Sequence, residues 1–452
     1  MKKILPVFLA ILSINSFAQT DSTFIRKVYD EALENGESYE NLRSLCKDIG
    51  ARITGSAEAE MAVKWGEKLL SSYGFDKVYL QEIKVPHWER GNKEAAWIIN
   101  EKGETLKLDI LALGGSIGTN GLIEGEVIEV ENVEALQQLS EDHVKGKIVF
   151  LSKAFDQKHI NTFHAYGGCY PIRGKGTNEA GKLNAKAVVI RSLATPEDDF
   201  PHTGTMHYDE GVNKIPGAAM STKNATLLSV WLKQGKVTLK MEMDCEKFED
   251  VTSYNVIAEM NGKDEKIITW GGHLDSWDVG DGAHDDGAGI VHSIEAMRIL
   301  KKLGYQPNHK LRCVLFMNEE NGNMGGKSYA KIASENKEQH ICAIESDRGG
   351  FLPTGFDVNG TEEQLKAVQN FKPLLSEFEL FRFKKGFGGV DIGPLKEYYP
   401  DMVQLGMAIN SQIYFNYHHS RNDVFENVNK RELELGAAAM ASMIYLVDKT
   451  LK

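Results

Sequence analysis

The sequence predicts an α/β fold, in which a mixed, mostly parallel sheet is flanked by helices and carries an inserted β-rich domain. Two observations predict it. From Ser253 onward, short apolar runs alternate with stretches of helical periodicity, which is typical of a sheet covered by helices on both faces. Between residues 123 and 246, short runs rich in Val and Ile are separated by glycine-rich loops, as expected of a separate β-rich unit.

The first residues have the pattern of a secretory signal peptide, residues 1–18. Lys2 and Lys3 precede an apolar run from Ile4 to Ile14, which is too short to span a bilayer comfortably. Small residues then offer a cleavage site after Ala18. We therefore expect an exported protein, periplasmic or secreted, without a membrane anchor after cleavage; an uncleaved anchor is the alternative.

The main domain is predicted in two parts, residues 19–122 and 247–452, on either side of the insert at 123–246. The alternative for the insert is that it continues the main sheet. The first part begins with helical sequence and a strand that ends near Pro86. Within the insert, the segment YGGCYPIRGKG is predicted to be a loop because of its glycines and proline. In the second part, strands are expected at 255–260, 266–272, 311–318, 341–347 and 402–409, and helices at 289–303 and 431–451.

Charge and cysteine content exclude some classes of protein. The chain of 452 residues has a formal net charge of −12, which argues against a nucleic acid partner. The five cysteines are widely spaced and form no C-x-x-C pair, so neither a disulfide framework nor a zinc knuckle is indicated. The motif HExxH is absent, which leaves a zincin unsupported.

Acidic residues and histidine follow three of the predicted strands. His273 and Asp275 follow the strand at 266–272, Glu319 and Glu320 follow the strand at 311–318, and Asp347 ends the strand at 341–347. In open α/β sheets, ligands bind at the carboxyl ends of the strands. The three strand ends therefore predict one site with metal-ligand chemistry.

The segment from Gly271 to Ile290 is the densest in candidate ligands. His273 offers an imidazole nitrogen to zinc, and the carboxylate of Asp275 is expected to accept the other ring N–H. One carboxylate of the pair Asp285–Asp286 is in a position to bridge two metals. Three further residues are expected to stay in solvated loop positions: Asp278, Asp281 and His284.

Two further segments complete the candidate site. Of Glu319 and Glu320, one is expected to ligate a metal and the other to act as general base on the water that attacks the substrate; the residues alone leave open which does which. His419 is expected to supply a second imidazole, whereas its neighbour His418 is expected to point elsewhere.

Taken in order, the motifs HLDS, GAHDDGAG, NEENG, ESD and HHSRND resemble those of the co-catalytic zinc exopeptidases, the clan of zinc aminopeptidases. HLDSWDVG, ESD and the segment PHTG at 201–204 are most similar to the carboxypeptidase Q branch. The resemblance implies that Asp285 bridges two zinc ions and is joined to Asp286 by a cis peptide bond. It implies the remaining roles as follows: His273 and Asp347 at one zinc, Glu320 and His419 at the other, Glu319 as general base, and Asp275 as the residue that orients His273.

The resemblance also implies an activity, which is hydrolysis of dipeptides or of terminal residues of short peptides with two Zn²⁺ per chain; Mn²⁺ or Co²⁺ suits the same donors. It suggests a homodimer and likens the insert to a protease-associated domain. GGVDIGPL at 388–395 departs from the Ser-Asp-His element of other branches, so the resemblance covers the metal ligands and does not extend to the substrate pocket. The candidate substrate contacts are His202, Thr203, Gly388 and Gly389.

Three other functions stay open. An aminopeptidase acting on longer peptides would use the same metals. An acyl transferase like the glutaminyl cyclases of the same clan would bind one zinc, and a non-catalytic binding homologue would bind none. The number of metal ions per chain therefore separates the peptide hydrolases, with two, from the acyl transferase and the binding homologue.

Overall fold

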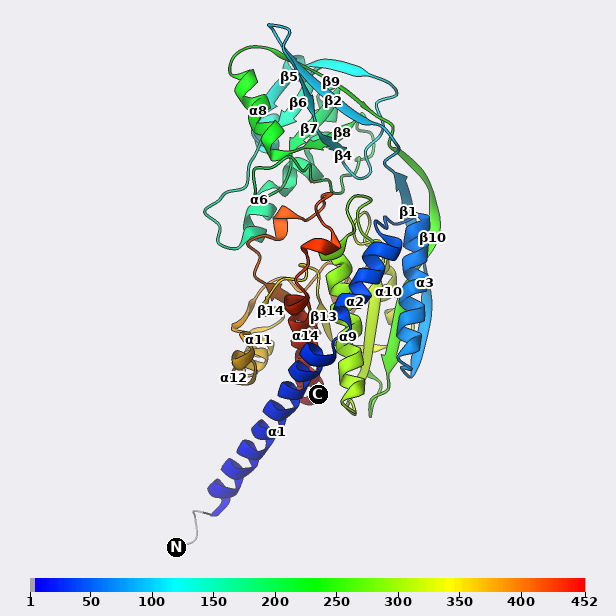
Figure 1. Cartoon of the computed structure of the whole chain (residues 1–452), viewed down its shortest axis with the longest axis vertical. Coiled ribbons are helices and arrows are strands. Elements are labelled where there is room, and N and C mark those ends of the chain that lie inside the picture. The colour runs from blue at the N-terminus through cyan, green and yellow to red at the C-terminus, as the bar shows by residue number, and fades with distance from the viewer. Residues whose placement is uncertain (1–4, 452) are drawn as a thin grey trace.

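The computed structural model describes residues 5–451, with side chains from residue 20. The predicted signal peptide and its cleavage site lie outside the residues described with side chains. Figure 1 shows a lower part with helices α9 and α14 and an upper β-rich part. In both views a long antiparallel pair, β1 (Lys77–Glu89) and β10 (Glu246–Met260), runs from one part to the other.

The lower part contains an eight-stranded sheet in the order β1-β10-β12-β11-β13-β16-β14-β15. Its central neighbours β12, β11, β13 and β16 are parallel, whereas β1, β10 and the pair β14–β16 are antiparallel, so the predicted mixed, mostly parallel sheet is confirmed. Besides β1 and β10, the strands are β11 (Lys266–His273), β12 (Lys310–Phe316), β13 (Gln339–Glu345), β14 (Pro353–Asn359), β15 (Arg382–Lys385) and β16 (Val403–Ile409).

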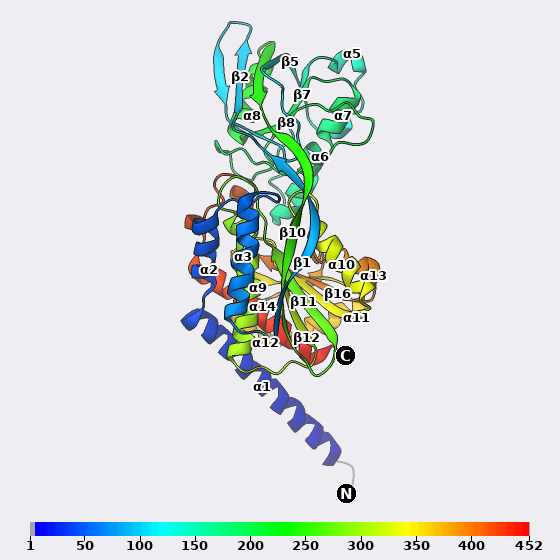
Figure 2. The ribbon, with the colours of Figure 1, turned by 90° about the vertical axis from the view of Figure 1, so that its right-hand side faces the viewer.

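Helices cover both faces of this sheet. Along β12, Cys313 and Leu315 pack into the larger core, whereas Val314 and Phe316 pack into a second cluster with Tyr329 of α10, because successive side chains of a strand point to opposite faces. Figure 2 shows the two layers of helices on either side of the strands. The main helices are α1 (Leu5–Asn35), α2 (Ser38–Ser44), α3 (Ala57–Ser72), α9 (Ala288–Lys302), α10 (Met324–Glu335), α11 (Glu362–Gln369), α12 (Lys372–Leu375), α13 (Leu395–Tyr398) and α14 (Lys430–Thr450).

The upper part contains a second eight-stranded sheet in the order β3-β2-β9-β5-β6-β7-β8-β4. The three of its strands that come earliest in the chain lie within residues 94–112, before the predicted start of the insert at 123, and the domain limits stay predictions. The strands are β2 (Glu94–Asn100), β3 (Thr105–Leu108), β4 (Ile110–Ala112), β5 (Ile123–Val130), β6 (Ile148–Leu151), β7 (Ala187–Arg191), β8 (Gly217–Met220) and β9 (Val237–Met243). Helices α4 (Val133–Leu136), α5 (Glu141–Val144), α6 (Thr162–Gly174), α7 (Gly176–Lys182) and α8 (Thr222–Leu232) complete it.

The segment YGGCYPIRGKG is largely helical, so the predicted loop was wrong. Most of it lies in α6, which begins after Asn161, whose side chain accepts a hydrogen bond from the N–H of Phe163. Ala165, Cys169 and Ile172 recur at helical spacing and are buried in one core cluster. This burial outweighs the low helix propensity of the segment's glycines and proline.

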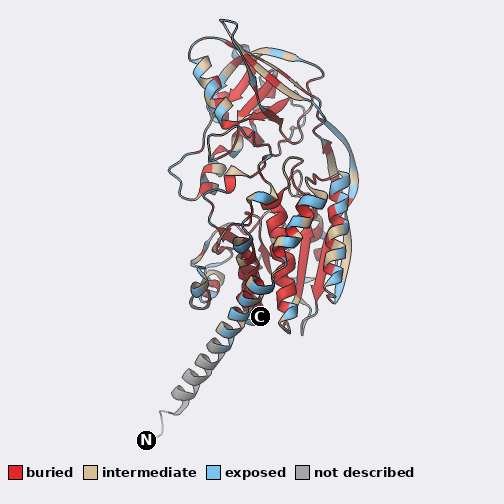
Figure 3. Cartoon of the chain, in the orientation of Figure 1, coloured by how far each residue is buried: buried red, intermediate tan, exposed pale blue. Residues whose placement is uncertain are grey.

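Buried residues are concentrated in the strands and in the helix faces that cover them (Figure 3). All five cysteines are buried free thiols, including Cys313 and Cys342 in the strands of the main sheet. Among the described residues, no helix has both the length and the apolar character needed to cross a membrane.

Candidate metal centre and active site

Asp285 lies at the centre of the candidate metal site, with its two carboxylate oxygens facing two different histidines. Oδ1 is 3.2 Å from Nε2 of His273, and Oδ2 is 3.2 Å from Nε2 of His419. The side chain is buried, at the carboxyl end of the main sheet, where β11 leads into the turn before α9. Asp285 therefore has the geometry of a carboxylate that bridges two ions.

The other predicted ligands divide into two groups around this bridge. On one side, Oδ1 of Asp347 lies 3.5 Å from Nε2 of His273. On the other side, Oε2 of Glu320 lies 3.1 Å from Nε2 of His419. The structure thus brings together all five predicted ligands, which are spread over the chain from residue 273 to residue 419.

The turn that carries Asp285 is held by carboxylates on both sides. The peptide bond between Asp285 and Asp286 is cis, as the resemblance implied. The carboxylate of Asp423 accepts hydrogen bonds from the backbone N–H groups of His284, at 2.7 Å, and Asp285, at 3.0 Å. Asp286 turns away from the other ligands and accepts from the N–H groups of His273 and Gly289, both at 3.0 Å. Asp286 therefore ties the end of β11 to the start of α9.

The donor set fits zinc. Donor atoms of His273, Asp285 and Asp347 all lie within 4.8 Å of one another. Oδ2 of Asp285 and Oε1 of Glu320 are buried and accept no hydrogen bond, which is costly for a carboxylate oxygen unless a cation faces it. Carboxylate and imidazole donors of this kind are the usual protein ligands of zinc.

Comparisons with known proteins give the family. The family model described as peptidase family M28 matches residues 255–444. Carboxypeptidase Q of Bos taurus is 34% identical over 430 residues, which is 93% of this chain and 86% of that protein. Carboxypeptidase Q of Homo sapiens has the same identity and the same shares of both chains. The chain belongs to peptidase family M28. It is a metallo-exopeptidase.

Solved structures agree with this assignment. A peptidase M28 precursor from Shewanella amazonensis SB2B superimposes with a TM-score of 0.90 at 31% identity, covering 95% of this chain and 97% of that one. An aminopeptidase from Aneurinibacillus sp. strain AM-1 has a TM-score of 0.64 at 20% identity and covers 93% and 95% of the two chains, so it shares the fold. The family resemblance and the fold class predicted from the sequence are therefore confirmed.

Glu319 and Glu320 take different positions in the M28 peptidase, although they are neighbours. Glu320 is buried against His419, whereas Glu319 faces the cavity, with Oε2 4.0 Å from Nε2 of His273. Burial raises the pKa of Glu319 well above its usual range; the charge of His273 opposes this shift, and the nearby carboxylate of Asp347 reinforces it. Burial also raises the pKa of Glu320, to about 7, so position distinguishes the two glutamates: Glu320 lies against His419, whereas Glu319 lies toward His273. These positions agree with the predicted roles of Glu319 as proton acceptor and Glu320 as metal ligand.

Asp275 contacts His273 through its backbone and not through its carboxylate. Nδ1 of His273 is 3.0 Å from the carbonyl oxygen of Asp275, whereas it is 3.8 Å from the nearer carboxylate oxygen. The expected carboxylate–imidazole hydrogen bond is therefore wrong. Instead, Oδ1 accepts from the backbone N–H groups of Asn318, at 2.7 Å, and Glu319, at 3.2 Å, and Oδ2 accepts from that of Glu320, at 3.3 Å. The carboxylate of Asp275 holds the loop that presents the two glutamates.

Two histidines lie where the sequence reasoning did not place them. His418 was expected to point elsewhere, yet its ring stacks on that of His419 with centroids 3.6 Å apart, and its Nε2 is 3.7 Å from Oδ2 of Asp285. His284 was expected in a solvated position, yet it is fully buried and stacks on Phe351. Packing of aromatic rings under the metal site explains both positions. Asp278 and Asp281 are only partly exposed, because they pair with Arg90 and Lys47.

The upper part of the molecule positions His419 through the segment PHTG. The backbone N–H of Thr203 donates to the carbonyl of His419 at 2.9 Å, and Nδ1 of His419 lies 3.2 Å from the carbonyl of Thr203. Nδ1 of His202 lies 2.6 Å from the carbonyl of His418. Both His202 and Thr203 are buried, and neither is among the described residues that line the cavity. Their contacts therefore position the predicted metal ligand His419, while a direct contact with substrate stays a prediction.

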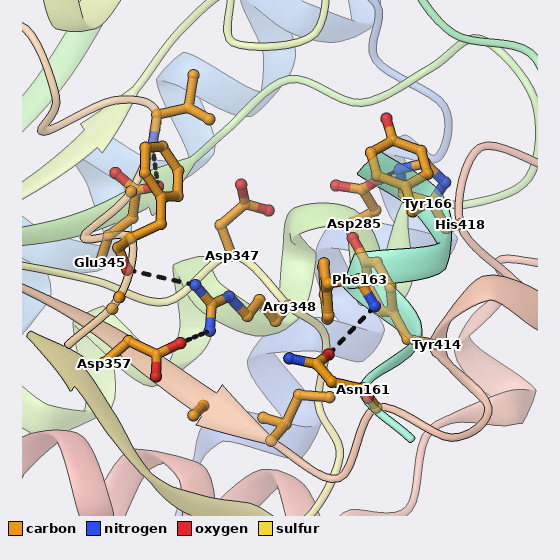
Figure 4. A pocket seen from close by; sticks show the side chains of 18 of the residues that line it. Asn161, Phe163, Tyr166, Asp285, Glu345, Asp347, Arg348, Asp357, Tyr414 and His418 are labelled. Atoms are coloured by element: carbon orange, nitrogen blue, oxygen red, sulfur yellow. Dashed lines mark hydrogen bonds and ion pairs between the residues drawn. The ribbon is translucent and has the colours of Figure 1, made fainter. Parts of the chain in front are cut away.

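A cavity of about 820 Å³ opens over the metal ligands. Figure 4 shows Asp285 and Asp347 facing it, with Tyr166 of α6 on one side. Gly388 and Gly389 line it, and their contact with substrate stays a prediction. Gly389 also permits a close approach, because a Cβ there would lie 2.2–2.4 Å from the carboxyl atoms of Glu345. Both parts of the molecule thus enclose the space next to the predicted metal ligands.

Several polar residues around the site were not predicted from the sequence. Glu345 accepts from the N–H groups of Val390 and Ile392, at 2.7 and 2.9 Å, and so holds the loop before α13. Asp391 is fully buried, and neither of its carboxyl oxygens has a hydrogen-bond partner. Burial, together with the charge of Glu345, raises the pKa of Asp391 well above its usual range. In the sequence, the one indication of a buried Asp391 was its place in the apolar stretch GGVDIGPL.

Proposed function

We propose that this M28 peptidase is an exported, zinc-dependent exopeptidase that hydrolyses dipeptides or removes terminal residues from short peptides. The observation that carries the proposal is the position of Asp285, whose two oxygens are each 3.2 Å from the Nε2 atom of a different histidine. A carboxylate shared in this way is the mark of a site for two metal ions. When bound, two zinc ions supply Lewis-acid activation of the water and of the peptide carbonyl.

In this proposal Glu319 moves the proton. Its carboxylate faces the cavity and lies 4.0 Å from the nitrogen that His273 presents to the metal, so the attacking water is within its reach. Glu319 accepts the proton of the water and then passes it to the amine that leaves. The raised pKa of Glu319 makes its carboxylate a stronger base than that of a fully solvated glutamate.

The shape of the cavity supports action on short peptides. At about 820 Å³ it is within the range of small-ligand pockets, and it is closed by residues of α6 on one side and by the loop containing Phe387 and Gly388 on the other. Because both walls rise beside the metal ligands, a peptide end fits more readily than the middle of a chain. The relatives called carboxypeptidase Q and the aminopeptidase of similar fold are named for removing terminal residues.

The proposal is tested with purified chain lacking residues 1–18 on a panel of dipeptides, aminoacyl amides and longer peptides, with and without a chelator. Zinc is counted by elemental mass spectrometry. Two zinc ions per chain and chelator-sensitive cleavage of dipeptides support the proposal. Preference for longer peptides with a free amino end would make it an aminopeptidase. One zinc with cyclisation of N-terminal glutamine, or no zinc and no turnover, would overturn it.

Export is tested separately. The signal-peptide pattern at residues 1–18 is its support. Fractionation of cells that express the full chain, followed by N-terminal sequencing, is expected to find a product that begins at Gln19 outside the cytoplasm. Uncleaved chain in the membrane fraction would favour the anchor instead.

A further inference from the structure

The wall of the cavity opposite the histidines is basic, although the chain as a whole is acidic. Four basic side chains line it: Arg348, Arg382, Lys384 and Lys385. Asp357 lies among them, with its side chain 6% exposed. Arg348 and Arg382 share this one carboxylate, and Lys385 pairs with Glu362 at 3.5 Å. Four basic side chains thus face two paired carboxylates, and the cluster keeps an excess of positive charge beside the predicted metal ligands. In a chain with a net charge of −12, this local excess calls for an explanation.

Arg348 is held rigidly and keeps free donors. Its Nη1 donates to Oδ2 of Asp357 at 2.9 Å, and its Nη2 donates to the carbonyl of Phe387 at 3.4 Å. Its guanidinium also lies over the ring of Phe163, 5.4 Å from the centroid. Arginine has five N–H donors, so three remain for a ligand. The side chain is 16% exposed, and Figure 4 shows it in the cavity between Asp347 and Asp357.

The second arginine keeps Asp357 in place. Nε and Nη2 of Arg382 donate to the two oxygens of Asp357 at 2.9 and 2.7 Å, which is the bidentate geometry that orients a carboxylate best. Arg382 therefore fixes Asp357, and Oδ2 of Asp357 also accepts from Nη1 of Arg348 and so orients it. Such pre-ordering lowers the entropy lost when Arg348 binds an anion.

We propose that Arg348 binds the free α-carboxylate of the substrate residue that follows the scissile bond. The inference rests on the proposed function and adds the orientation of the substrate. The carboxyl end of a dipeptide lies against the basic wall, and its peptide carbonyl faces Asp347 and Asp285. Arg348 directly follows Asp347 in the chain, and in a dipeptide a single residue separates the scissile carbonyl from the terminal carboxylate. Planar guanidinium and carboxylate groups match in shape and charge.

The experiment compares three substrates, Ala-Leu, Ala-Leu amide and Ala-Glu amide, on the zinc-loaded wild type and on Arg348→Met. The α-carboxylate is present only in Ala-Leu, and a side-chain carboxylate only in Ala-Glu amide. Wild type is expected to show a kcat/KM for Ala-Leu at least about 10-fold above that for Ala-Leu amide, as for one charge-assisted hydrogen bond. Arg348→Met is expected to lower kcat/KM for Ala-Leu about 10- to 100-fold and that for Ala-Leu amide less than about 3-fold.

Controls separate this role from a structural one. Arg348→Lys keeps the charge without the planar fork and is expected to fall between wild type and Arg348→Met. Arg43→Met removes an exposed arginine of α2 that does not line the cavity, and is expected to match wild type on every substrate. Zinc content and thermal unfolding of each variant are measured in parallel. If Arg348→Met fails to fold, the preference of the wild type for Ala-Leu over Ala-Leu amide, and its change in Arg348→Lys, still test the inference.

Two results would overturn the inference. One is equal kcat/KM of wild type for Ala-Leu and Ala-Leu amide, and the other is a preference for Ala-Glu amide over Ala-Leu, which would assign the basic wall to a substrate side chain. If no peptide is cleaved, the proposed function fails, and calorimetric binding still tests the subsite. Ala-Leu must then bind wild type more tightly than its amide does, and Arg348→Met must abolish the difference; otherwise the inference fails as well.

Discussion

Asp275→Asn tests the finding that the carboxylate of Asp275 holds the loop of the two glutamates. This fully buried carboxylate accepts hydrogen bonds from the N–H groups of Asn318, Glu319 and Glu320 and from the hydroxyl of Thr54. Asparagine keeps one acceptor oxygen. In the less costly of its two orientations, the amide nitrogen of the asparagine takes the place of Oδ2. The hydroxyl of Thr54 can then turn and accept a hydrogen bond from this nitrogen. The backbone N–H of Glu320 cannot, so it loses its acceptor.

The expected magnitude follows from that lost contact. A hydrogen bond to a charged group contributes about 1.5–3 kcal/mol, and the N–H that loses it belongs to the metal ligand Glu320 itself. At about 1.4 kcal/mol per factor of ten, the affinity for the metal beside Glu320 should fall about 10- to 150-fold. This agrees with the usual loss of about 10- to 100-fold when a residue that supports a metal ligand is removed.

The assay is zinc retention against graded chelator, with kcat/KM for a dipeptide measured alongside. The double variant Asp275→Asn/Glu320→Gln identifies the route: if Asp275 acts through Glu320, adding Asp275→Asn to Glu320→Gln should lower zinc retention little further. Fully additive losses in the double variant, or wild-type zinc retention in the single one, would refute the reasoning. Glu265→Gln, whose side chain is 87% exposed, is the matched control and should behave as wild type.

Three more predictions follow from particular contacts. Glu319→Gln should leave the bound zinc and the melting temperature unchanged but lower kcat about 10²–10⁴-fold, because glutamine has the shape of glutamate but cannot accept the proton. Near-normal turnover would show that Glu319 is not the general base. His202→Ala removes the 2.6 Å contact with the carbonyl of His418 and should weaken zinc retention more than it changes KM. A change in KM with normal zinc retention would instead show that His202 contacts the substrate. Burial raises the pKa of Glu434 to about 7, with the charge of Glu295 adding to the shift, so the folded state favours the protonated form. Its contribution to stability is therefore present below about pH 4.5 and lost as the pH rises to about 7. At about 1.4 kcal/mol per unit, Glu434→Gln should raise the free energy of unfolding in urea by about 1–3 kcal/mol at pH 8 and little at pH 4.5. The exposed Glu40→Gln should show no such pH dependence, and equal effects of Glu434→Gln at both pH values would contradict the assignment.

The main sheet could be predicted because its strands are short apolar runs separated by amphipathic helices. The runs at 266–272 and 311–318 became β11 and β12 with small changes at their ends. Helix α6 could not be predicted, because its glycines and Pro171 disfavour a helix locally and only the packing of Ala165 and Cys169 into the upper core supports it. In α6, burial of side chains in the tertiary structure outweighs the low helix propensity of the segment.

By itself, the sequence determined the family, the kind of fold and the residues able to bind metal, because strand ends and their acidic or histidine side chains are local features. The tertiary structure decided what each side chain does. It separated Asp285, with an oxygen toward each of two histidines, from Asp286, which holds backbone. It also placed Arg348 opposite the histidines and linked His419 to Thr203, 216 residues away. Such contacts join segments far apart in the chain, and no spacing in the sequence encodes the distances between them.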